Sequence, residues 1–140
     1  MKILTAELAL RHQDVLGECP LWDERQQALW WPDIRGPRLH RWTGEGAPQS
    51  WDFDEPVGSI ALTQDGTLLL AMQTAVRRFD PATGALTEFA RPKNEPPTNR
   101  FNDGRCDRAG RFWVGTMSDG PREPVATLPT PGTNRIATPA

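Results

Sequence analysis

The stretch Ile60-Ala-Leu-Thr-Gln-Asp65-Gly66, followed by an apolar run to Met72, is one of three copies of a short phrase. Each copy has apolar residues, an aspartate, a turn and a second hydrophobic run. The other two copies are Pro20-Leu-Trp-Asp23 with the run to Trp30-Trp31, and Gly104-Arg-Cys-Asp107 with the run to Val114. Asp23, Asp65 and Asp107 are separated by steps of 42 and 42 residues, within the range of about 40 to 45 residues of a four-stranded β-propeller blade. We therefore predict an all-β chain of about three propeller blades.

Each phrase predicts a β-hairpin with the aspartate in its turn. Turn chemistry there separates runs rich in β-branched, aromatic and aliphatic side chains. An aspartate at such a point accepts hydrogen bonds from the backbone amides of its own turn, so we interpret the three repeat aspartates as structural rather than catalytic. Further strands are predicted at 38–42, 76–79 and 85–89, while the 12 glycines and 14 prolines leave no sustained helical pattern.

The regular pattern ends near Met117. We predict that residues 1–117 form the N-terminal part of a β-propeller and that 118–140 form an irregular or disordered tail, because prolines recur through that stretch. Known propellers close with about four to eight blades, so three blades predict either a truncated chain or self-association through the open propeller edge. The tryptophans at 22, 30, 31, 42, 51 and 113 are predicted to fill the space between blades.

Charge and composition exclude several classes of partner. The net charge is −2 and the basic residues are scattered, which argues against a nucleic-acid partner. No apolar run approaches the roughly 20 residues of a membrane span, and Glu7 interrupts the apolar start, which we interpret as a first strand rather than a signal peptide. Cys19 and Cys106 are isolated, so neither a disulfide framework nor a zinc cluster is implied and a reduced, cytoplasmic location is expected.

Two segments carry residues suited to chemistry. Glu18 lies at the entry to the first phrase, and Asn99-Arg-Phe-Asn-Asp-Gly104 precedes the third. Glu18 and Asn102 each lie five residues before their repeat aspartate, so on innermost strands they would converge at the propeller's central mouth. Such oxygens suit Ca²⁺, Mg²⁺ or Mn²⁺, and a carboxylate also suits Zn²⁺. The alternative is that Glu18 pairs with an arginine and 102–104 is a simple turn, which the residue types alone favour.

Longer strings within 14–117 resemble the SMP-30/gluconolactonase (regucalcin) family. They are Leu-Gly-Glu-Cys-Pro-Leu-Trp-Asp (16–23), Val-Gly-Ser-Ile-Ala-Leu (57–62), Asn-Arg-Phe-Asn-Asp-Gly-Arg-Cys-Asp (99–107) and Gly-Arg-Phe-Trp-Val-Gly-Thr-Met (110–117). Among its members, sugar-acid lactonases such as arabinonolactonases and xylonolactonases are the most similar. The resemblance implies a six-bladed propeller with one divalent metal at the central mouth, held by a glutamate of the first blade, which Glu18 matches, and by an Asn and an Asp that would follow residue 140.

The same resemblance implies a function and further site residues. It implies a metal-dependent hydrolase that opens a small-molecule sugar lactone to the sugar acid, with Arg100 and Asn102 binding sugar oxygens and Ca²⁺, Zn²⁺, Mg²⁺ or Mn²⁺ as the cofactor. Some members carry an acidic residue just after Gly-Thr-Met, where this chain has Gly120 beside Asp119.

No catalytic residue is assigned within 1–140, and the chain is expected to be a truncated, inactive half. The alternative is a non-catalytic metal- or partner-binding propeller fragment. We interpret His12 and His40 as surface or strand residues, and the two cysteines as small strand fillers.

Overall fold

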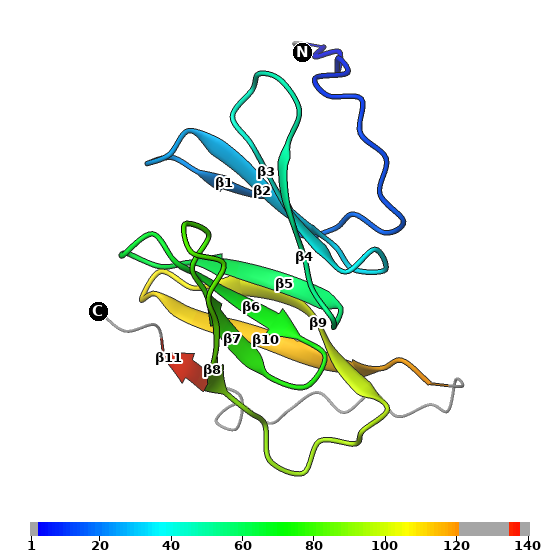
Figure 1. The fold of residues 1–140 in the computed structure, drawn as a ribbon, viewed down its shortest axis with the longest axis vertical. Coiled ribbons are helices and arrows are strands. Elements are labelled where there is room, and N and C mark those ends of the chain that lie inside the picture. The colour runs from blue at the N-terminus through cyan, green and yellow to red at the C-terminus, as the bar shows by residue number, and fades with distance from the viewer. Residues whose placement is uncertain (1–2, 121–134, 138–140) are drawn as a thin grey trace.

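All regular structure in the described part of the chain is β-strand. A computed structural model describes residues 3–120 and 135–137, and its strands form three antiparallel sheets (Figure 1). Blade one has the order β1 (Leu21–Asp23), β2 (Ala28–Asp33), β3 (Arg38–Trp42) and β4 (Gln49–Asp52). Blade two has the order β5 (Val57–Leu62), β6 (Leu68–Met72), β7 (Val76–Phe79) and β8 (Leu86–Ala90). Blade three contains β9 (Asn99–Cys106), β10 (Arg111–Ser118) and β11 (Arg135–Ala137), with β10 in the middle.

The prediction of an all-β chain is confirmed, and each repeated phrase forms the first hairpin of one sheet. The tail predicted to be irregular lies largely outside the described residues, at 121–134 and 138–140. Within its described part, Arg135–Ala137 pair with Arg111–Trp113 as a third strand of blade three. No helix capable of crossing a membrane occurs among the described residues.

The three repeat aspartates lie in equivalent turns. The Oδ1 atoms of Asp23, Asp65 and Asp107 accept hydrogen bonds from the backbone amides of Arg25 (2.9 Å), Thr67 (3.1 Å) and Ala109 (2.9 Å), two residues further on. Hydrogen bonds from the hydroxyl groups of Thr63 and Thr67 lower the pKa of Asp65 well below its usual range. Such a carboxylate stays ionised and is a poor general base. The structural interpretation of these aspartates is confirmed.

Blade two lies between the other two blades and packs against both. Alternate residues of β6 point to opposite faces of its sheet. Leu68, Leu70 and Met72 join a core cluster with Trp30 and Leu39 of blade one. The other face of β6 presents Leu69 and Ala71 to Phe101, Phe112 and Val114 of blade three. Because both faces are apolar, the central strand has no polar alternation in its sequence.

The tryptophans divide between packing and exposure. Trp30 is fully buried and stacks on Trp51 at 5.5 Å between ring centroids, and Trp51 meets Phe79 of blade two edge-on at 5.6 Å. The prediction of packing between blades is therefore right for Trp30 and Trp51. Trp22 and Trp113 are 49% and 39% exposed on blades one and three, and for them packing between blades stays a prediction. The indole N–H of Trp113 donates to Asp107 (2.9 Å), so this side chain contacts the β9–β10 turn.

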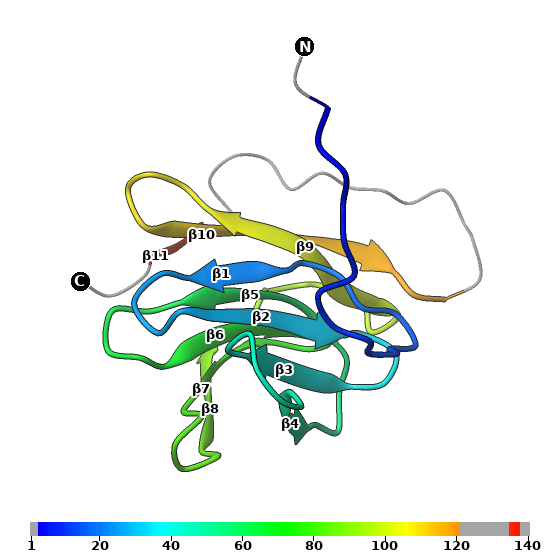
Figure 2. The same ribbon diagram turned by 90° about the horizontal axis from the view of Figure 1, so that it is seen from above.

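The segment before β1 runs along blade one without forming a strand (Figure 2). The predicted first strand is thus absent from residues 3–14, which pair with none of the described strands. The buried carboxylate of Asp33 holds the next part of the segment, residues 15 and 16, against blade one. It accepts hydrogen bonds from the backbone amides of Val15 (3.0 Å), Leu16 (2.9 Å) and Gly36 (2.9 Å). An isolated bridge also joins Gly17 to Asp33.

This clamp predicts a pH-dependent contribution to stability. Burial favours a higher pKa for Asp33, but hydrogen bonds from backbone amides outweigh it and hold the pKa below its usual range. A group with a lowered folded pKa stabilises the fold above its unfolded pKa of about 3.9, and the contribution is lost as the pH falls through the folded pKa. Asp33→Asn should lower the free energy of unfolding by about 1–3 kcal/mol at neutral pH, because its amide N–H groups would face backbone donors.

Urea unfolding of the wild type and Asp33→Asn at several pH values measures this effect. The difference in free energy should shrink on acidification below about pH 4. Asp52→Asn is the control, since the Asp52 side chain is 78% exposed and its replacement should change stability by less than about 0.5 kcal/mol. A difference between wild type and Asp33→Asn that stays constant with pH would contradict the assignment.

Candidate functional site

The first strand of each sheet borders one hollow. Its lining comes from the entry to β1 and from β1, β5 and β9, and it encloses about 200 Å³. The lining residues are Cys19, Leu21, Ile60, Ala61, Leu62, Gly104, Arg105 and Cys106. The three strands that begin the repeats therefore lie around this hollow. The N-terminal portion of β9 carries Arg100 and Asn102, and Glu18 lies in the segment that leads into β1.

Glu18 is exposed and directly precedes Cys19, which lines the hollow. Its backbone N–H donates to the carbonyl of Pro32 (3.2 Å), which fixes the chain against the end of β2. The next residue, Cys19, has a positive φ of 48° and directs its Sγ to within 3.9 Å of the Gly104 carbonyl oxygen. The segment that carries Glu18 thus touches blade three, although among the described residues no hydrogen bond or ion pair links Glu18 to Arg100 or Asn102.

Arg100 is a buried cation on β9. Its exposed fraction is 4%, and its Nη1 donates to the carbonyl of Phe101 (3.0 Å) and to the side-chain oxygen of Asn102 (3.1 Å). The structure therefore brings together the two residues expected to bind substrate. The buried Nε of Arg100 has no hydrogen-bond partner among the described residues. An unsatisfied buried donor of this kind is rare in folded proteins and calls for an acceptor.

Asp119 connects Arg100 to blade one. Its Oδ1 lies 3.4 Å from Arg100 Nε, and both carboxylate oxygens accept from Arg35, at 2.6 and 3.1 Å. Its backbone N–H donates to the Thr98 carbonyl (2.9 Å), so the residue is held at the end of β10. Asp119 is therefore the acidic residue after Gly-Thr-Met that contacts Arg100. The next residue, Gly120, has no side chain that could do so.

Sequence reasoning missed Arg35 altogether. It lies in the turn between β2 and β3 and belongs to no motif, and it reaches Asp119 across 84 positions of the chain. Only the tertiary arrangement that brings the β2–β3 turn of blade one to the end of β10 in blade three could reveal it. The bidentate pair is charge-assisted and geometrically specific, so Arg35 orients the carboxylate that faces Arg100.

The cysteines at this site are poorly suited to nucleophilic chemistry. Both are free. Burial raises the pKa of the Cys19 thiol above its usual range, and a protonated thiol is a weak nucleophile. The arrangement instead offers oxygen and nitrogen groups for binding. Glu18 offers an exposed carboxylate, and β9 offers the buried guanidinium of Arg100 and the amide of Asn102. No described residue is identified as a general base.

The chain matches known proteins over most of its length. A model of the SMP-30/gluconolactonase/LRE-like region matches residues 16–133. The chain is 38% identical over 115 residues to a 6-deoxy-6-sulfogluconolactonase of Pseudomonas putida, which covers 81% of this chain and 39% of that relative. It is 35% identical over 119 residues to a regucalcin of Xenopus laevis, covering 84% of this chain and 40% of that relative. The chain thus spans about 40% of the length of these relatives.

The fold is also similar to that of a solved structure. The crystal structure of a regucalcin from Agrobacterium tumefaciens, described as a calcium-binding protein, matches with a TM-score of 0.72 and 30% identity over 79% of this chain and 38% of that one. The likeness confirms that the sheets described above are blades of a propeller. The roles expected for Glu18, Arg100 and Asn102 stay predictions.

Proposed function

This chain belongs to the SMP-30/gluconolactonase/LRE-like family, and from that premise we propose that it is part of a metal-dependent hydrolase that opens a small-molecule sugar lactone to the sugar acid. The observation that carries the proposal is the buried guanidinium of Arg100, held by a hydrogen bond to Asn102 and an ion pair with Asp119. A cation fixed in this way suits a ligand rich in oxygen acceptors, which a sugar lactone is.

Arg100 and Asn102 divide the binding task. Asn102 Oδ1 already accepts from Arg100, so its amide nitrogen is left to donate to a sugar hydroxyl. Arg100 is oriented on one side by Asn102 and on the other by Asp119, which Arg35 holds in turn. This chain of contacts fixes the guanidinium before substrate arrives, which lowers the entropic cost of binding.

Glu18 supplies one oxygen ligand for a divalent cation in this proposal. Its exposed carboxylate fits a hard cation such as Ca²⁺, Mg²⁺ or Mn²⁺, and also Zn²⁺. Bound there, the cation would polarise the lactone carbonyl toward attack by water. One carboxylate falls short of the six to eight oxygens that Ca²⁺ takes. We therefore expect the 140-residue chain to bind a cation weakly at Glu18 and to be inactive as an isolated chain.

Two more expectations complete the proposal. The two free cysteines are compatible with a reducing, cytoplasmic environment. One face of blade three packs against blade two, and the opposite face points away from it. In an open set of blades, that opposite face has no neighbouring blade. Self-association of the chain through that open side is the arrangement we propose for the isolated polypeptide.

Binding of an aldonate, the product of lactone opening, tests the assigned site in the 140-residue chain. Ligand-observed NMR should detect binding to the wild type, and Arg100→Lys and Asn102→Ala should each weaken it by about tenfold or more, since each removes hydrogen bonds to a charged or polar partner. Arg108→Lys is the matched control because Arg108 is exposed in the β9–β10 turn. Equal binding by Arg100→Lys and the wild type would remove Arg100 from the site.

Hydrolysis is tested by two assays in parallel. A panel of aldonolactones should show no turnover by the 140-residue chain with or without divalent cations. A chimera that joins residues 1–117 to the remaining part of the P. putida relative should hydrolyse one of them only when a cation is present, and Glu18→Gln should weaken that cation dependence. A folded chimera without lactonase activity would contradict the proposed reaction.

A further inference from the structure

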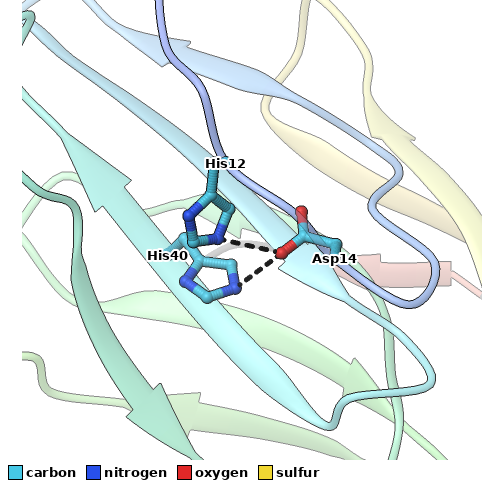
Figure 3. Close-up of side chains that lie close together, drawn as sticks. All are labelled: His12, Asp14 and His40. Carbon is cyan, nitrogen blue, oxygen red and sulfur yellow. Dashed lines mark ion pairs between the residues drawn. The ribbon is translucent and has the colours of Figure 1, made fainter.

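Three side chains of types that can ligate a metal meet at blade one (Figure 3). His12 and Asp14 come from the segment before β1, and His40 comes from the middle of β3. The Nε2 atoms of His12 and His40 lie 3.0 and 3.2 Å from the same carboxylate oxygen, Oδ1 of Asp14. All three ligand atoms lie within 4.8 Å of one another. Two imidazole nitrogens and one carboxylate oxygen therefore converge on a single point.

The cluster lies on the face of blade one that is turned away from blade two. Leu39 packs in the core shared with blade two, and its neighbour His40 points to the opposite side of the sheet because side chains alternate along a strand. Trp31 is the cross-strand neighbour of His40 and shares that face. The segment that contains His12 and Asp14 covers this face, so the cluster joins the segment to the sheet.

His40 carries an unsatisfied nitrogen aimed into the cluster. Its side chain is 3% exposed, and its Nε2 has no hydrogen-bond partner among the described residues although Asp14 Oδ1 is close. Its Nδ1 lies 2.7 Å from the hydroxyl of Ser50. If Nδ1 donates to that hydroxyl, the lone pair of Nε2 faces a carboxylate oxygen, and the two repel. A cation between them would turn this repulsion into two favourable contacts.

Neighbouring groups orient the ligands as they do in protein metal sites. Ser50 can accept from Nδ1 of His40, and in that tautomer Nε2 carries a free lone pair. Trp31 donates its indole N–H to Asp14 Oδ2 (2.8 Å), which leaves Oδ1 for the two imidazoles.

We propose that His12, Asp14 and His40 bind one divalent cation of the zinc class, with a water molecule at the fourth position. Imidazole nitrogens favour Zn²⁺ over Ca²⁺ or Mg²⁺, and zinc commonly takes two histidines and a carboxylate with an open fourth position. The side chain of His12 is 29% exposed, so solvent reaches the site. The donor set differs from the oxygen ligand expected at Glu18, and so does its place in the fold.

The consequence of the site is structural. A metal here would tie residues 12 and 14 to β3, directly before residues 15 and 16, which Asp33 holds. The chain then reaches Glu18. Metal binding would therefore order the segment that delivers Glu18, in the way that structural zinc contributes to folding.

Titration of the 140-residue chain with Zn²⁺, followed by isothermal calorimetry, tests the proposal. One Zn²⁺ should bind per chain. His12→Gln and Asp14→Asn should each weaken binding by at least about 100-fold, because loss of a ligand exceeds the roughly 10- to 100-fold effect of losing an outer partner. Ser50→Ala should weaken it by about tenfold. Asp54→Asn, at an exposed position, is the matched control and should bind like the wild type.

NMR of the wild type gives a second readout that needs no variant to fold. The chain contains two histidines, and both lie in the cluster, so their imidazole signals should shift together at one equivalent of Zn²⁺. Failure of either signal to shift, or unchanged affinity in His12→Gln and Asp14→Asn, would overturn the site. Loss of zinc binding in Glu18→Gln with both variants unaffected would place the metal at Glu18 instead and would also overturn it.

Discussion

Gly58→Ala is expected to lower the free energy of unfolding by about 3 kcal/mol, the upper end of the usual cost of overpacking. A β-carbon at this position of β5 would overlap the Phe101 carbonyl oxygen and lie 2.8 Å from that of Asn102. Both obstacles are backbone atoms of β9, so no side-chain rotation relieves the contact. The two inner strands would have to separate, and Arg100 and Asn102 on β9 would move with them.

Gly115→Ala is the matched control for this substitution. Gly115 is also a strand glycine, in β10, but a β-carbon there meets no other atom within 4 Å. Its replacement should leave stability unchanged or raise it by up to about 1 kcal/mol, because alanine reduces the entropy of the unfolded chain. Urea unfolding followed by tryptophan fluorescence measures both variants. Equal effects of the two substitutions would show that β5 and β9 do not require glycine at their closest approach.

Trp30→Ala is expected to lower the free energy of unfolding by about 3–5 kcal/mol, the range for loss of a large core aromatic. Trp30 is fully buried between blades one and two, stacked on Trp51. Its indole N–H has no hydrogen-bond partner among the described residues, so the loss would come from packing and not from a broken hydrogen bond. The cavity would open between two sheets, which have few ways to collapse around it.

Trp22→Ala removes the same atoms from an exposed position and serves as the control. Trp22 is 49% exposed on β1, so its replacement should cost less than about 1 kcal/mol. Chemical denaturation followed by far-ultraviolet circular dichroism suits this pair, since both variants lose a fluorescent residue. A small effect of Trp30→Ala would mean that the contact between blades one and two contributes little to stability.

Local patterns predicted the blades. The 42-residue spacing of Asp23, Asp65 and Asp107 located the first hairpin of every sheet, because a turn aspartate acts on backbone amides within a few residues of itself. The pairing of Arg100 with Asn102 was predictable for a similar reason. Residues two positions apart on a strand lie on the same face, so their side chains are neighbours wherever the strand packs.

Sequence patterns could not predict contacts between distant segments. Arg35 meets Asp119 across 84 positions, and His12 and Asp14 meet His40 through a segment that forms no strand. The sequence analysis interprets the two histidines as surface or strand residues, and it did not predict that they come together with Asp14. The exposure of Trp22 and Trp113 was not predicted either, because composition does not show which face of a blade is covered.

The amino-acid sequence was thus sufficient for the all-β class, the repeat and the turns, because these depend on interactions between near neighbours along the chain. The tertiary arrangement of the blades was needed to place every contact between residues of different blades. It sets which tryptophans are buried, how Asp119 bridges Arg35 and Arg100, and where the histidine and aspartate ligands meet. Such contacts arise from the packing of whole sheets, and no local sequence pattern around these residues indicates which distant residue they contact.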